Sequence, residues 1–157
     1  INTITITEII MNGHRFETAA DAKTFILGGS AVFTLTSLKT GKHFTFKVKE
    51  KKEEGLNGPN LRFVNVLAGP DNHSFDESVY LGFIPSDGSK LVAGKKGRPD
   101  APSFKALAWV LAHLNNDNLP EQVKIQHEGR CCKCNRVLTH PESLDRGIGP
   151  ECAKHFG

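Results

Sequence analysis

The distribution of cysteines is the feature that most constrains how this chain can fold. The 157 residues include four cysteines, Cys131, Cys132, Cys134 and Cys152, and residues 1–130 contain none. Disulfides therefore cannot cross-link the main body, and the two adjacent cysteines would strain any pairing in the tail, because disulfide geometry is narrow. Thiols gathered around a metal ion in a reducing compartment fit better. We expect a metal site near the C-terminus and a cytoplasmic location.

The spacing of the donors predicts how such a site would be built. Cys131 and Cys134 are separated by two residues, which lets both sulfurs point at one ion from a tight turn. Pro150 is suited to the first turn of a helix. Cys152 and His155 would then lie three residues apart on one face of that helix. The pattern therefore predicts two pairs of ligands.

The fourth ligand is open at this point. His155 has the better helical spacing, while His127 precedes the first ligand cysteine by four residues and is the alternative. His140 lies in an expected turn and ranks third. Cys132 is too close in sequence to the next cysteine for the usual turn, so we expect it to be a bystander.

A tight turn followed by a helix with two ligands is the layout of a treble-clef-like, closed tetrahedral zinc site. A metal-free unit is disfavoured, because residues 127–157 hold too few large apolar side chains to build a core unaided. A catalytic zinc with Glu128 or Glu151 nearby is the other alternative, but four good ligands favour a closed site. The predicted site is a structural Zn²⁺ held by Cys131, Cys134, Cys152 and His155, with His127 as the alternative fourth ligand.

The remainder of the chain predicts an α+β fold with a mostly antiparallel sheet and two helices. β-rich runs bounded by turn residues predict the strands. These runs are 3–11, 31–38, 43–50, 61–68, 78–84 and 123–127, with a short segment at 91–92. Phe44, Phe46 and Val48 would share one face of their strand, and Thr45, Lys47 and Lys49 the other.

Capping residues and apolar periodicity predict the two helices. The first follows a cap at Thr18 and ends at Gly28-Gly29. The second follows a cap at Ser103 and runs to about Asn116, with apolar residues at helical spacing. We expect an α+β body at 1–126 and a zinc-binding unit at 127–157. No long apolar run occurs, so no membrane span is expected.

The C-terminal motif H-x-G-x-C-x₂-C-x-R-x-L-T-x-P-E-S-x₃-G-I-G-P-x-C, which begins at His127, resembles a family of uncharacterised small zinc-binding domains. Such domains occur in bacteriophage and bacterial proteins, sometimes attached to nucleic-acid enzymes. The segments T40-G-K-H-F-T-F, L67-A-G-P-D-N and Y80-L-G resemble, more loosely, the body that accompanies this tail in phage proteins. The resemblance implies zinc and a phage or mobile-element setting in a bacterial host cell, and it implies no activity.

Two basic runs are the other feature with a functional implication. Residues 39–52 contain six lysines and one acid, for a local charge of +5, and residues 90–98 add four cations. The whole chain carries only +3, which falls to about +2 if three thiolates bind Zn²⁺. Nucleic-acid binding therefore requires these local patches. The simpler alternative is a solvated sheet face protected by lysines.

No nucleophile elbow, HExxH motif or dinucleotide fingerprint occurs, so we do not expect an enzyme. Our first hypothesis is a zinc-containing accessory protein that binds DNA phosphates. The residues assigned to the phosphates are Lys47, Lys49, Lys95, Lys96 and Arg98. The alternative is a protein-binding module, such as a phage inhibitor of a host defence or replication enzyme.

Overall fold

A seven-stranded antiparallel sheet dominates the part of the chain that the computed structural model describes, which is residues 14–51, 61–67, 78–85, 87–94, 99–127, 131–132 and 148. The strands are β1 (His14–Arg15), β2 (Ser30–Ser37), β3 (His43–Lys51), β4 (Leu61–Leu67), β5 (Ser78–Ile84), β6 (Val92–Ala93) and β7 (Val123–His127). Their order is β1-β7-β2-β3-β4-β5-β6. Together with the helices α2 (Ala19–Ile26) and α3 (Pro102–Asn115), this sheet confirms the predicted mixed fold of an antiparallel sheet and two helices.

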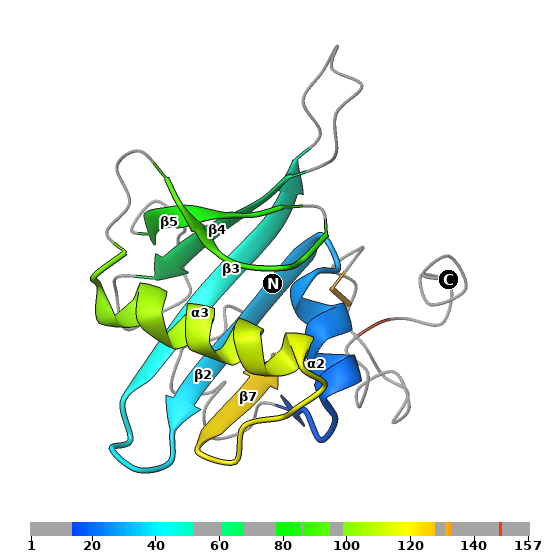
Figure 1. Cartoon of the computed structure of the whole chain (residues 1–157), viewed down its shortest axis with the longest axis vertical. Coiled ribbons are helices and arrows are strands. Elements are labelled where there is room, and N and C mark those ends of the chain that lie inside the picture. Colours follow the sequence, from blue (N-terminus) through cyan, green and yellow to red (C-terminus); the bar gives the residue numbers. More distant parts are fainter. Residues whose placement is uncertain are drawn as a thin grey trace, which may run out of the picture.

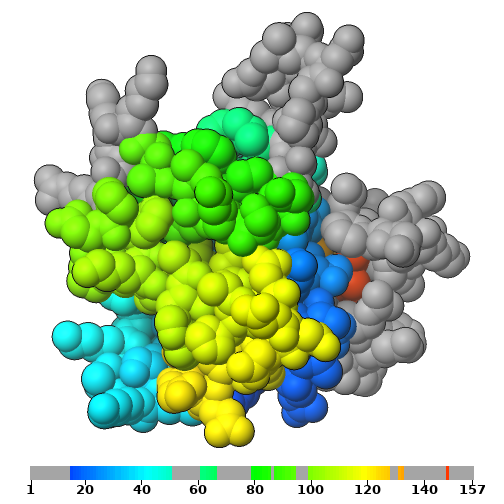
Figure 2. Space-filling view, viewed as in Figure 1, coloured from blue at the N-terminus to red at the C-terminus, as the bar shows by residue number. Residues whose placement is uncertain are grey.

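Both helices lie on one side of the sheet. Figure 1 shows α3 crossing in front of the strands with α2 beside its C-terminal half. Viewed from the same side, α3 and the segment after it cover the middle of the sheet (Figure 2). The apolar face of α3, including Phe104, Leu107 and Leu111, is buried against the strands. This is how an amphipathic helix removes its apolar stripe from water.

Local signals set the helix starts in two different ways. Thr18 caps α2 as predicted, because its Oγ1 accepts a hydrogen bond from the backbone N–H of Asp21. The predicted cap at Ser103 is wrong. Ala101 is the N-cap of α3 and makes no side-chain hydrogen bond, while Pro102 occupies the first turn, where its fixed φ favours a helical start. Ser103 is instead buried inside the helix.

Strict alternation along β2 and β3 divides the sheet into two faces. Phe33 pairs with Phe46 and Ala31 with Val48, and all four side chains are buried on the side that carries the helices. Lys47 lies between these two pairs on β3, so its side chain belongs to the opposite side. We call that opposite side the open face.

The last strand of the sheet is inserted between two strands from the start of the chain. β7 pairs with β2 on one side, where Leu35 lies opposite Ile125, and with β1 on the other, where His14 lies opposite His127. The segment that leads into the cysteine cluster is thereby part of the sheet. The predicted strand at 3–11 and the predicted treble-clef unit lie outside the described residues.

The described residues beyond β7 pack into the same core. Cys131, Cys132 and Ile148 are buried within the cluster that contains the apolar residues of the sheet and helices. The carbonyl oxygen of Cys132 accepts a hydrogen bond of 2.7 Å from the backbone N–H of Ser30. A Cβ placed on Gly28 would lie only 2.4 Å from the Cys132 Sγ. Cys132 is therefore seated against the turn that ends α2.

No helix in the described ranges is long and apolar enough to cross a membrane.

We predict that Gly28→Ala lowers the free energy of unfolding by about 1–3 kcal/mol, since the added methyl group overpacks the contact with Cys132. Urea unfolding followed by circular dichroism measures this change. The cost should be smaller in a Cys132→Gly background, where Sγ and Cβ are gone and only the Cys132 carbonyl oxygen, 2.8 Å from the added Cβ, remains in contact. Equal costs in both backgrounds would contradict the proposed steric cause.

Candidate functional site

Only part of the predicted zinc site falls among the described residues. Cys131 is fully buried, with 0% of its surface exposed. Cys134, Cys152 and His155, and also His140, lie outside the described residues. Within the described ranges no three histidine, cysteine or acidic side chains form a group that could hold a metal ion. The thiol of Cys131 is a chemically suitable donor for zinc, and its burial suits a closed site.

His127, the alternative fourth ligand, is a core residue at the end of β7. Its ring is fully buried, and its centroid lies 5.0 Å from that of Phe16 and 5.1 Å from that of Phe25. These two phenyl rings also contact each other, at 5.1 Å. The imidazole therefore has a packing role in an aromatic cluster, whichever atom its nitrogens bind.

Lys47 and Lys49, the two lysines of the first basic run that are assigned to phosphates, lie together on the open face. Lys49 is exposed and Lys47 is half-buried, two positions apart on β3. The pKa of Lys47 is lowered from its usual value of 10.5, first by burial and then by the positive charge of Lys49. These two ammonium groups therefore raise the electrostatic potential of one patch.

An aromatic pair adjoins the two lysines. The register of β3 with β4 places Phe63 opposite Lys49 and Asn65 opposite Lys47, and β5 places Tyr80 opposite Asn65. The ring centroids of Phe63 and Tyr80 are 6.1 Å apart. We call these five residues the basic–aromatic patch. The aromatic half of this patch cannot be inferred from the sequence, because Phe63 and Tyr80 join the lysines only through the strand register.

The charge on the open face is of one sign across the described strands. Glu50 is their only acidic residue, and alternation puts it on the side opposite to Lys49. Its carboxylate lies near Gly29, at 3.2 Å from a Cβ built there. Arg62 also points away from the patch, since its guanidinium donates to the carbonyl oxygens of Leu27 and Pro85.

Burial limits the patch to one end of the open face. At the β2–β7 end, Thr34, Thr45 and Gln126 are all buried, and the hydroxyls of the two threonines are 2.8 Å apart. Tyr80, by contrast, is 36% exposed. The accessible part of the face is therefore the part that carries the lysines and the aromatic rings.

The second basic run, residues 90–98, passes beside Tyr80 at Gly94. A Cβ built on Gly94 would be 2.4 Å from Cε2 of the Tyr80 ring. Gly94 is the last described residue before Lys95. Lys95, Lys96 and Arg98 lie outside the described residues.

Comparison with known protein families gives a match at the C-terminal segment. Residues 125–157 match a model described as a family of unknown function, DUF6011. No curated protein and no solved structure matches the chain. The match starts inside β7 and includes every predicted zinc ligand, and it names neither a metal nor a host. The C-terminal segment of this chain is therefore similar to an uncharacterised family.

Proposed function

We propose that this protein is a non-catalytic accessory protein that binds single-stranded nucleic acid through the basic–aromatic patch. The observation that carries the proposal is that Lys47 and Lys49 share an accessible sheet face with the Phe63–Tyr80 pair. Cations track a phosphate backbone, and aromatic rings stack on unpaired bases without reading their sequence. The second basic run, with Lys95, Lys96 and Arg98, would extend the contact with phosphates.

The partner is single-stranded rather than double-stranded because of the aromatic rings. Bases within a duplex already stack on one another, so only unpaired bases are available to Tyr80. The charges alone would bind either form of DNA. The setting in a bacteriophage or mobile element rests on the resemblance of the C-terminal segment.

We also propose a structural zinc ion in the C-terminal unit, held by Cys131, Cys134, Cys152 and His155. Its support is the spacing of the donors and the full burial of the Cys131 thiol. Bound zinc would hold together a unit that has few large apolar side chains. His127 is the weaker candidate for the fourth ligand, since its ring is already packed against Phe16 and Phe25 in the core.

We predict that the wild-type protein binds an oligothymidine and that Tyr80→Ala weakens binding by about 5- to 150-fold, the usual loss of one stacked base. Lys49→Gln should weaken binding and make the negative slope of log affinity against log salt shallower by about 0.7. Fluorescence anisotropy over a salt series measures both effects. Lys23→Gln, on α2 at the other side of the sheet, is the matched control for charge. Absence of binding at low salt would refute the proposal.

Lys47 offers a test that separates function from stability. Its lowered pKa means that the unfolded chain keeps this proton to higher pH than the folded protein, so its contribution to stability rises as the pH increases towards 10.5. Lys47→Met should lower the oligothymidine affinity at neutral pH, and it should remove the rise in stability that Lys47 contributes as the pH increases towards 10.5. Unchanged affinity, or an unchanged pH dependence of the melting temperature, would contradict this expectation.

For the metal, we predict about one zinc per chain by elemental analysis and its loss in Cys131→Ala. Cys132→Ala is the matched control, since the neighbouring thiol is also buried and should leave the zinc content unchanged. His155→Ala should lose zinc. His127→Phe should keep it, because a phenyl ring preserves the packing with Phe16 and Phe25. Zinc loss in Cys132→Ala, or zinc retained in Cys131→Ala, would contradict the assigned ligands.

A further inference from the structure

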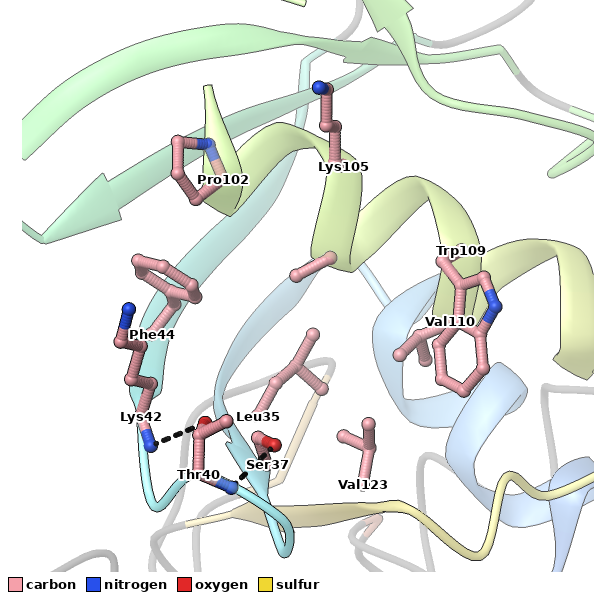
Figure 3. A pocket seen from close by; sticks show the side chains of 11 residues that line it. Leu35, Ser37, Thr40, Lys42, Phe44, Pro102, Lys105, Trp109, Val110 and Val123 are labelled. Carbon is pink, nitrogen blue, oxygen red and sulfur yellow. Dashed lines mark hydrogen bonds between the residues drawn. The ribbon is translucent and has the colours of Figure 1, made fainter. Parts of the chain in front are cut away.

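A groove of about 410 Å³ lies on the helix-covered side of the sheet, between α3 and the β2–β3 hairpin. Its floor is apolar, with Leu35 and Phe44 from the hairpin, Val110 from α3 and Val123 from β7 (Figure 3). The volume lies in the range of about 300–1,000 Å³ that is usual for ligand sites. The groove therefore offers a hydrophobic surface on the face opposite to the basic–aromatic patch.

Cations stand at both sides of this groove. Lys42 belongs to the hairpin and ends beside Phe44, while Lys105 lines the groove from α3 with its ammonium group directed away from the floor (Figure 3). Both lysines are exposed, and no acidic residue is among the described residues that line the groove. The flanking carboxylates, Asp100 and Glu121, do not line it. The rim therefore favours a negatively charged occupant.

The hairpin side of the rim is held in place by its own turn. The backbone N–H of Thr40 donates to Ser37 Oγ at 3.2 Å, and the backbone N–H of Lys42 donates to Thr40 Oγ1 at 3.3 Å (Figure 3). These bonds order the turn that carries Lys42. The hydroxyl oxygens of Ser37 and Thr40, which both line the groove, thus accept hydrogen bonds from the turn itself.

Trp109 forms the opposite part of the rim and is held by its neighbour on the helix. Its side chain is 40% exposed, and its ring centroid lies 4.1 Å from that of His113. The Nδ1 of His113 lies 2.9 Å from the Trp109 carbonyl oxygen, which fixes the imidazole beside the indole. A large exposed aromatic ring that is already ordered loses little entropy on binding, as in the anchor residues of protein interfaces.

We propose that this groove docks a short, acidic, extended segment of a partner protein, with two large apolar side chains between carboxylates. Pro102 and Trp109, at its two ends, are separated by about 10 Å along α3. About three residues of extended chain cover that length, and side chains two positions apart point to the same side. Two apolar side chains would enter the floor, and flanking carboxylates would meet Lys42 and Lys105.

A nucleic acid suits this groove less well than a peptide. Leu35, Val110 and Val123 provide no hydrogen-bond partners, so the polar edges of a base would be buried without compensation. Leucine or phenylalanine side chains carry no such penalty. The proposal goes beyond nucleic-acid binding, since the two surfaces lie on opposite sides of the sheet and are separable by mutation.

The chain contains a single tryptophan, so its fluorescence reports on this groove alone. The probe is a short synthetic peptide that places Leu and Phe two positions apart between Asp and Glu residues. We expect it to shift Trp109 emission to shorter wavelength as the indole leaves water. A peptide with Lys in place of the acids, and one with Ala in place of Leu and Phe, should each bind at least about tenfold weaker.

Charge reversal on the protein provides a second test. Lys42→Glu should weaken the affinity for the acidic peptide by about tenfold or more. Lys23→Glu, an equal change of charge on α2, should leave this affinity unchanged. Calorimetry with Trp109→Ala, checked for folding by circular dichroism, should show loss of binding. Equal shifts with acidic and basic peptides, a larger shift with oligothymidine, or a concentration-dependent shift without peptide would each overturn the proposal.

Discussion

The pairing of β7 with β2 is the interaction on which the rest of the arrangement depends. β7 is the last described strand, and it enters the sheet between β1 and β2, which come from the opposite end of the described chain. The ladder carries Ile125 and His127 into the core, next to Phe33 and Phe25. The residues that follow then reach the turn after α2. There the carbonyl oxygen of Cys132 accepts a hydrogen bond from the backbone N–H of Ser30.

The two-residue period of the strands places the two proposed binding surfaces, the basic–aromatic patch and the groove beside α3, on opposite sides of the sheet. On β3, Phe44 borders the groove, and Lys47 and Lys49 belong to the open face. A one-residue slip of β3 would exchange these sides and bury both ammonium groups under α3. The core pairs Ala31–Val48 and Phe33–Phe46 disfavour such a slip, because Val48 and Phe46 would then leave the core that they share with the helices. Packing of the core thus keeps the cations accessible.

Local patterns were sufficient for most of the elements. Strands were predicted at 31–38, 43–50, 61–68, 78–84 and 123–127, and the observed strands differ from these by about one residue at either end. The predicted cap at Ser103 was wrong although a serine side chain suits an N-cap. The helix begins one residue before Ser103, because the fixed φ of Pro102 favours the first turn. Phe63 and Tyr80 could not be assigned to a face shared with Lys49, since strand register is not a local property.

The sequence by itself determined the elements of the body, the cluster of possible zinc ligands and the excess of positive charge near β3, because these depend on neighbouring residues. The tertiary structure decided which residues meet. Only the strand order brought Phe63 and Tyr80 to Lys47 and Lys49, and only the crossing of α3 over the hairpin formed a groove beneath Trp109. Contacts between distant segments follow from burying one shared core, and no short stretch of sequence contains that information.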